Sequence, residues 1–203
     1  MPKVTQLQTQ VKRANRYSIH IDGKYAFSLS ANDLIATGLH SGQELTEAEV
    51  ERYRKLSLES KAVDRVYNFL SYRQRTEKEV RDYLRKKGYE DEFGDQVVDK
   101  LKRQGMISDQ QFAVSWVGSR QSLRPRSRRR LEQELRQKGV STELIAETLA
   151  AVSDEDEVAA IQEIATKKLS QAKYRDQPTL VKYLASQGFS YDLIKRALEE
   201  LET

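Results

Sequence analysis

LEQELRQKGV, residues 131–140, is the stretch that decides the fold, because two other stretches repeat its plan. They are VRDYLRKKGY, which starts at Val80, and LVKYLASQGF, which starts at Leu180. In each, an apolar residue lies eight positions before a glycine, a leucine lies four positions before it, and an apolar residue follows it directly. The three glycines are separated by 51 and 49 positions: Gly88, Gly139 and Gly188. Matches at nearly equal spacing indicate an internal repeat.

Each repeated stretch predicts a helix that stops at its glycine. Apolar residues four apart lie on one face of a helix, and glycine adopts the left-handed conformation that ends many helices. A second helix is predicted where apolar residues recur six and ten positions after the glycine: Ile145 and Leu149, then Ile194 and Leu198. In the first copy Val97 and Leu101 take these places after a three-residue insertion. Another helical stretch precedes each pair, so the repeating unit has three helices.

The predicted fold class is mainly α, with three tandem three-helix repeats preceded by a small module of antiparallel β-sheet and helix. We expect the first repeat at 61–105, the second at 106–152 and the third at 153–203. Thr76 and Glu79 have the spacing of a capping box, which marks the start of a helix in the first repeat.

Residues 1–60 form the N-terminal module and are expected to contain about three antiparallel strands. β-Branched and aromatic residues lie on both sides of an Asp-Gly pair, which is typical of a hairpin. A three-residue loop, with Gly23 left-handed in a bulge, would put four residues on one face: Tyr17, Ile19, Tyr25 and Phe27. A sheet this thin is not stable alone. We therefore expect it to pack on SANDLIATGL (30–39) and on the helix opened by the capping-box pair Thr46 and Glu49.

Composition favours a soluble, non-enzymatic protein of the cytoplasm. The 203 residues include no cysteine, which excludes disulfides and thiol catalysis. The two histidines, His20 and His40, have no partners at ligand spacing, so neither a metal nor another cofactor is expected. No phosphate-binding glycine loop, dinucleotide turn, nucleophile elbow or zinc-protease helix is present. No segment approaches the length of apolar chain that crosses a membrane.

Five arginines occupy the seven positions from Arg124 to Arg130, where the repeated helix of the second copy begins. Cations are unfavourable there, because the amino end of a helix already carries about half a positive charge. The third copy has RDQPT at the equivalent place, with Pro178 in the first turn, so folding alone does not require the arginines. Residues 106–150 carry 8 basic and 5 acidic side chains, whereas residues 151–203 carry 7 and 10. The arginines are therefore interpreted as surplus to folding and as a surface for an anionic partner.

The candidate contact residues come from the first and second repeats. Arginine, more than lysine, makes two-pronged contacts with carboxylates and phosphates, so both kinds of partner fit. The candidates are Arg73, Arg75, Arg85, Lys86, Lys87, Arg124, Arg126, Arg128, Arg129 and Arg130. Other charges, such as Glu134 and Lys138 four positions apart, are interpreted as ordinary pairs on solvated helix faces.

Three motifs, in this order, resemble the RecX regulatory proteins of bacteria: FLSYRQRTEKEVRDYLRKKGY, LKRQGMISDQQFA and RPRSRRRLEQELRQKGV. The resemblance covers about residues 60–200, and the first 60 residues look like the extension carried by longer members. It implies a helical monomer that binds in the groove of the RecA–single-stranded DNA filament and bridges neighbouring protomers. It further implies suppression of the RecA ATPase and of strand exchange, together with either a block of filament extension or faster filament disassembly. Regulation of homologous recombination and the SOS response would follow. The family has no catalytic residues to transfer, and the matching contact positions are Arg73, Arg75 and the arginines of 124–130.

A second interpretation is a direct DNA-binding protein, whose helix–turn–helix-like units place arginines on phosphates. The net charge of +4 is modest for such a protein, and no base-reading motif is evident. Binding to DNA alone is therefore predicted to be weak and to fall steeply with salt. Both interpretations stay open on the sequence.

Overall fold

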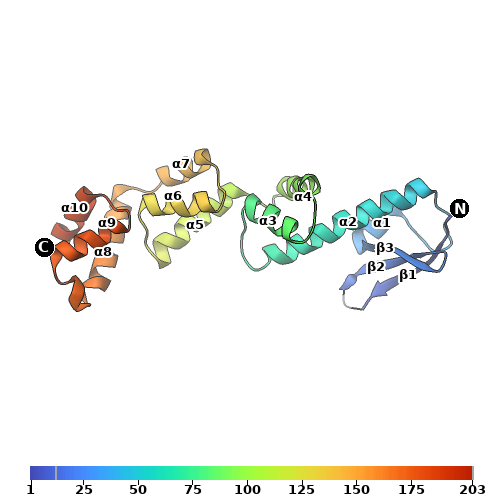
Figure 1. Cartoon of the computed structure of the whole chain (residues 1–203), viewed down its shortest axis with the longest axis horizontal. Helices are drawn as coiled ribbons and strands as arrows, with labels where there is room; N and C mark the ends of the chain where they lie inside the picture. Colours follow the sequence, from blue (N-terminus) through green and yellow to red (C-terminus); the bar gives the residue numbers. More distant parts are fainter. Residues whose placement is uncertain (12, 203) are drawn as a thin grey trace. The chain divides into compact units, whose positions relative to one another are not determined.

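The computed structural model describes residues 1–11 and 13–202, in which three strands are followed by helices (Figure 1). The strands are β1 (Val4–Gln10), β2 (Arg13–Ile21) and β3 (Lys24–Ser30). The first helices are α1 (Ala31–Thr37), α2 (Glu47–Leu70), α3 (Glu77–Lys86) and α4 (Asp91–Arg103). The next are α5 (Asp109–Leu123), α6 (Arg128–Gln137) and α7 (Thr142–Ala150). The last are α8 (Asp154–Leu169), the short 3-10 helix η1 (Ala172–Tyr174), α9 (Gln177–Ser186) and α10 (Tyr191–Glu202). The predicted mainly α fold with a small antiparallel sheet is confirmed.

The chain forms two compact units. One comprises Met1–Arg73 and Gly88–Leu101, and the other comprises Gln74–Lys87 and Lys102–Thr203. Helix α3 therefore belongs to the same unit as helices α5 to α10. The repeat boundaries proposed from the sequence, after residues 60, 105 and 152, stay predictions.

The sheet has the order β1-β2-β3, and its hairpin differs from the one predicted. Asp22 and Gly23 form a two-residue turn with φ of 49° and 76°, which suits the right-handed twist of the strands. The predicted three-residue loop is thus wrong, although Gly23 is left-handed as expected. A bulge at Ala26 of β3 separates the pairs His20–Tyr25 and Ile19–Phe27. It places Phe27 opposite Ile19 on the buried face. Tyr25 pairs with His20 instead and is 54% exposed, so its predicted place with the other three is wrong.

The sheet packs on α2, as expected for so thin a layer. Its core combines residues of all three strands with Val50 and Tyr53 from the first turns of α2, and Leu34 of α1 packs against it. Thr46 and Glu49 form the predicted capping box at the start of α2. Helices α1 and α2, which were predicted from the sequence to pack on the sheet, therefore both contribute to its core.

A buried arginine fixes β2 to the middle of α2. The Arg16 side chain is 3% exposed and forms an ion pair with Asp64, while Nη1 also donates to the Ser60 hydroxyl at 2.9 Å. Its Nη2 donates to the Ser28 carbonyl at 3.0 Å, so the guanidinium bridges two strands and a helix. A charge buried this deeply is tolerated because it is paired and hydrogen-bonded.

The repeated stretches fold alike, which confirms the periodicity argument. Gly88, Gly139 and Gly188 have φ of 83°, 84° and 91°. The apolar residues eight and four positions before them are 0–2% exposed: Val80, Leu84, Leu131, Leu135, Leu180 and Leu184. Val140 and Phe189, directly after two of the glycines, lie in the cores of the second and third repeats. Each of these two repeats thus encloses its own small hydrophobic core.

Candidate functional site

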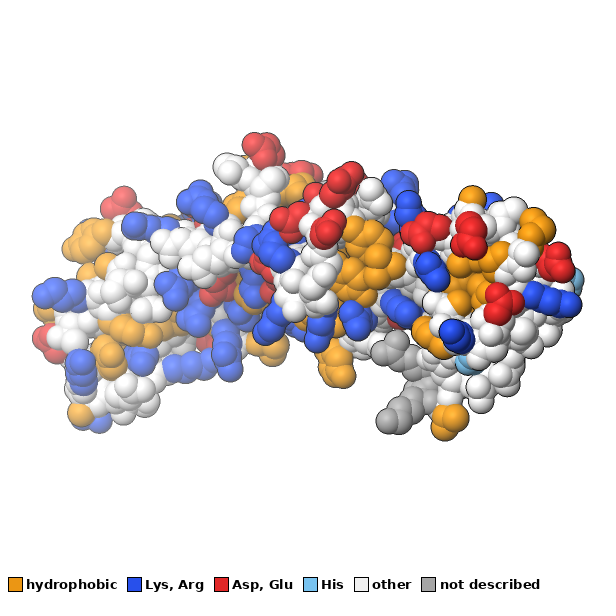
Figure 2. Space-filling view, turned by 45° about the vertical axis from the view of Figure 1, so that its right-hand side comes forward, with side chains coloured by type: hydrophobic (Ala, Val, Ile, Leu, Met, Phe, Trp, Pro, Cys, Tyr) orange, Lys and Arg blue, Asp and Glu red, His pale blue; other side chains and the backbone are white. Residues whose placement is uncertain are grey.

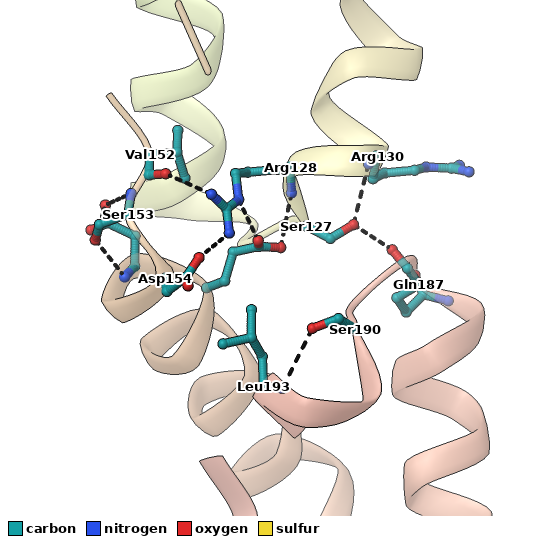
Figure 3. Close-up of polar contacts among 11 residues, drawn as sticks. Ser127, Arg128, Arg130, Val152, Ser153, Asp154, Gln187, Ser190 and Leu193 are labelled. Carbon is teal, nitrogen blue, oxygen red and sulfur yellow. Dashed lines mark hydrogen bonds and ion pairs between the residues drawn. The ribbon is translucent and has the colours of Figure 1, made fainter. Parts of the chain in front are cut away.

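Arg128, at the start of α6, forms ion pairs with carboxylates of helix α8 (Figure 3). Its Nε donates to the Glu157 carboxylate at 2.5 Å, its Nη2 donates to Asp154, and its backbone N–H donates to Glu157 at 3.1 Å. The bond to Glu157 is the main cause that raises the pKa of Arg128 above its ordinary value, and partial burial opposes it. The interpretation of every arginine in the run as surplus to folding is therefore wrong for Arg128. The helix α8 carboxylates supply the counter-charge that the amino end of α6 otherwise lacks.

Ser127 makes a second link from α6 to the third repeat. Its side chain is buried, accepts the Arg130 N–H at 3.2 Å and donates its own hydrogen to the Gln187 carbonyl at 2.8 Å (Figure 3). One hydroxyl therefore caps α6 and also satisfies a carbonyl at the end of α9. We name the contacts of Ser127 and Arg128 with Gln187 and Glu157 the second junction.

Similar contacts join α3 to the second repeat. We name the contacts of Thr76, Glu77 and Glu79 with Lys138 and Asp109 the first junction. The Thr76 hydroxyl caps α3 and donates to the Lys138 carbonyl at 2.7 Å, just past the end of α6. The backbone N–H of Glu77 donates to the Asp109 carboxylate of α5 at 2.8 Å. Burial is the main cause that raises the pKa of Asp109, and the nearby Glu77 carboxylate adds to it. Thr76 and Ser127 both lie twelve positions before a repeat glycine, which is the signal in the sequence that could have identified the junctions.

Arg126 lies beside a cluster built on the single tryptophan. Trp116 Nε1 and Arg120 Nε both donate to Glu134 at 2.9 Å, and the Arg120 guanidinium stands 4.1 Å from the centre of the indole ring. Arg126 Nε is 3.8 Å from the same carboxylate, so its charge is partly compensated. This cluster was not predicted from the sequence, although the spacing of four between Trp116 and Arg120 places both on one helix face.

The predicted pair of Glu134 with Lys138 is wrong. Lys138 Nζ instead contacts Glu79 of α3 at 2.8 Å, and the Glu134 side chain is only 18% exposed. Glu134 accepts hydrogen bonds within the tryptophan cluster, whereas Lys138 forms its ion pair within the first junction. Spacing along one helix could not reveal this, because both true partners come from other helices.

The exposed arginines of the run are Arg124, Arg129 and Arg130. Lysine and arginine side chains are scattered over the face drawn in Figure 2, so exposure alone does not identify a site. What distinguishes these three is that the described part of the chain gives them no carboxylate within ion-pair distance. They are the members of the run whose charge the fold leaves uncompensated.

The basic residues of the first repeat do not form one group. Arg75 lies just before α3, whereas Arg85, Lys86 and Lys87 lie at its other end, and ten helical residues span about 15 Å. Arg73 belongs to the other compact unit. Arg85 pairs with Asp82 at 3.3 Å, and Lys87 Nζ lies 5.5 Å from the centre of the Tyr83 ring.

Neither a metal site nor a membrane-spanning helix is found in residues 1–11 and 13–202. No group of three or more histidine, aspartate or glutamate side chains in that range is placed to hold a metal ion. No helix there is both long and apolar enough to cross a bilayer.

The N-terminal antiparallel sheet followed by three-helix units is an architecture that known proteins share. Family models match three segments: the RecX N-terminal domain at residues 2–46, the first three-helix domain at 62–101 and the second three-helix domain at 108–149. Regulatory protein RecX of Bacillus velezensis is 35% identical over 208 residues, which cover all of this chain and 78% of the relative. Regulatory protein RecX of Listeria monocytogenes is 34% identical, over 98% of this chain and 75% of the relative. The chain belongs to the RecX family.

Solved structures agree with this assignment. A crystal structure of regulatory protein RecX matches with a TM-score of 0.78 at 28% identity, covering 98% of this chain and all of that one. The crystal structure of RecX from Lactobacillus salivarius matches with a TM-score of 0.64 at 28% identity, covering 71% of this chain and 96% of that one. The first of these likenesses extends over the N-terminal module as well as the helical repeats.

Proposed function

We propose that this protein is a non-enzymatic, monomeric, cytoplasmic regulator that binds the RecA–single-stranded DNA filament and lowers its ATPase activity, extension and strand exchange. Membership of the RecX family supports a regulatory role. The observation that carries the proposed contact surface is the contrast within one arginine run. The fold uses Arg128 for a junction, whereas Arg124, Arg129 and Arg130 are exposed without a described counter-charge.

The modular architecture supports a partner that is itself repetitive. In a repeat protein each unit contacts mainly the units next to it in sequence. Successive units can therefore each offer a surface to a repetitive partner. Exposed guanidinium groups on such a surface suit carboxylates of a protein groove as well as phosphates of the DNA within it. Among the first-repeat candidates, Arg75, Arg85, Lys86 and Lys87 are proposed to add weaker contacts, and Arg73 is proposed as a separate one.

Inhibition of the RecA ATPase tests the proposal. A variant with Arg124→Gln, Arg129→Gln and Arg130→Gln should need at least about tenfold more protein for half-inhibition, because it loses three exposed charge contacts. The matched control removes three exposed charges elsewhere: Lys24→Gln, Lys55→Gln and Arg175→Gln. Circular dichroism should show that both variants fold. Equal inhibition by both variants would exclude this surface from the contact.

Direct DNA binding is the alternative function, and the same arginines favour it. Fluorescence anisotropy with a bare oligonucleotide and with a RecA-coated one separates the two functions. The proposal predicts weak binding to the bare strand, with a log–log salt slope near −0.7 for each phosphate contacted, and tighter binding to the coated strand. Equal affinity for the two would favour the DNA-binding function.

A further inference from the structure

A cavity of about 270 Å³ lies where the start of α6 meets the end of α9. Its lining comprises Arg129, Arg130, Gln133, Ala185, Ser186, Gln187 and Gly188. We infer that this cavity binds a phosphate group. Phosphate is common to the nucleic-acid backbone and to free nucleotides, and the test below distinguishes these sources.

The lining of the cavity carries positive charge and no negative charge. Both arginines are exposed, the described chain places no carboxylate at ion-pair distance from them, and the lining contains no acidic residue. Gln133 follows Arg129 by four positions and Arg130 by three, so the three side chains share one face of α6. Two guanidinium groups and an amide therefore surround one opening without an anion of their own.

The first junction provides an internal comparison, because it fills the equivalent place with its own anion. There Glu79 corresponds to Arg130, Lys138 corresponds to Gln187, and the two side chains form an ion pair at 2.8 Å. In the second junction a cation replaces that carboxylate and a neutral amide replaces the lysine. The counter-ion that the first junction supplies from within is missing from the second, so an external anion completes it.

Hydrogen bonds to the neighbouring backbone reduce its repulsion of an anion. Carbonyl groups at the end of a helix repel negative charge. The Gln187 carbonyl, however, already accepts the Ser127 hydroxyl at 2.8 Å, and the Ala185 carbonyl accepts the Gly188 N–H at 2.9 Å. Two of the backbone carbonyls in the lining are thus already hydrogen-bonded.

The geometry favours phosphate over a protein carboxylate. The donors come from both helices: the guanidinium groups and the Gln133 amide come from α6, and the Gln187 amide comes from the end of α9. The Ser186 hydroxyl donates to the Tyr183 carbonyl at 2.6 Å and accepts from the Gln187 amide at 3.4 Å, so it helps to position that amide. A planar carboxylate faces one arginine fork, whereas the oxygens of a tetrahedral phosphate reach donors in several directions. This inference deepens the proposed function, since it names the chemistry met by two of its arginines.

Titration of the full chain with small anions tests the site without RecA, so it can fail independently of the proposed function. The arginine Nε resonances of the 15N-labelled protein are followed while inorganic phosphate or acetate is added at constant ionic strength. Phosphate should shift the signals of Arg129 and Arg130 more than acetate does, and more than it shifts Arg124. Equal shifts with acetate would overturn the inference in favour of a carboxylate partner.

Oligonucleotide and nucleotide titrations then identify the source of the phosphate. Tighter binding of an oligothymidylate than of ATP assigns the site to a nucleic-acid backbone, and the reverse assigns it to a free nucleotide. Arg129→Gln with Arg130→Gln should weaken oligonucleotide binding about tenfold at low salt and reduce the salt slope by about 0.7, the loss of one phosphate contact. Lys78→Gln with Arg175→Gln is the matched control and should change neither.

A charge exchange provides a second variant that keeps the junction paired. Arg130→Glu with Gln187→Lys transplants the ion pair of the first junction into the second and should abolish the phosphate-induced shifts while the fold survives. Unchanged shifts in this variant, or an unchanged salt slope in the double glutamine variant, would overturn the inference.

Discussion

Replacing Glu157 by glutamine should uncouple the third repeat from the second. The Glu157 side chain is 7% exposed and accepts two hydrogen bonds from Arg128, one from the backbone N–H and one from Nε. Glutamine keeps an oxygen for the backbone N–H but loses the charge-assisted bond, and hydrogen bonds to charged groups contribute about 1.5–3 kcal/mol. Since the Arg128 side chain is 37% exposed, water replaces part of that loss. We expect a cost of about 2 kcal/mol, or about 4–8 °C in melting temperature for a chain of this length.

A double-mutant cycle isolates this contact from other effects. Arg128→Gln should cost about 3 kcal/mol, because it leaves the buried Glu157 carboxylate without its main partner. The double variant should cost less than the sum of the two, with a coupling energy of at least about 1 kcal/mol. Urea unfolding followed by circular dichroism and by Trp116 fluorescence measures these free energies. Trp116 reports on the second repeat.

The control for the cycle is Glu155→Gln. Glu155 lies in the same first turn of α8, is 71% exposed and stands 3.5 Å from Arg196, so its loss should cost less than about 0.5 kcal/mol. Additivity of Glu157→Gln and Arg128→Gln within about 0.3 kcal/mol would refute the assigned ion pair. A cost at Glu155 equal to that at Glu157 would also refute it, because burial would then not matter.

Two further predictions concern the junctions. Gly188→Ala would place a Cβ 2.7 Å from the Ser127 Oγ at a φ of +91°, whereas Gly88→Ala meets no atom within 4 Å at +83°. Both should lose about 1 kcal/mol to backbone strain, and Gly188→Ala should lose about 1–3 kcal/mol more; equal melting temperatures would contradict the Ser127 contact. Asp109→Asn keeps an acceptor for the Glu77 N–H but removes a carboxylate whose pKa is raised mainly by burial. A raised pKa means that the folded protein binds the proton more tightly than the unfolded chain does. The variant should therefore be more stable than the wild type at pH 7 and lose this advantage as the pH falls toward about 4, measured as the difference in urea midpoint. An advantage that persists or grows at low pH would contradict the assigned burial.

The sequence predicted the helical repeats well because their determinant is periodic. Leu131, Leu135 and Gly139 fix a buried face and a stop, and every copy repeats these positions. The hairpin was harder. A three-residue loop with a bulge and a two-residue turn followed by a bulge both bring Ile19 opposite Phe27, so alternation of residue types cannot separate them.

The division of labour among the arginines was beyond the sequence. Arg128, Arg129 and Arg130 are adjacent and chemically identical, but the partner of Arg128 lies 29 positions away on α8. Glu157 itself belongs to an acidic run that suits any helix start, which concealed its second use. Only the packing of one repeat on the next distinguishes an arginine that holds the fold from one that faces solvent.

The hydroxyl-to-carbonyl links at Thr76 and Ser127 have an evolutionary consequence. Every amino acid brings a main-chain carbonyl, so the accepting side of each link places no demand on which residue ends the neighbouring helix, as Lys138 and Gln187 illustrate. Substitutions at the residue that ends the neighbouring helix can therefore accumulate while the hydroxyl-to-carbonyl link is kept. Duplicated modules of this kind can diverge toward new ligands while their stacking is inherited unchanged.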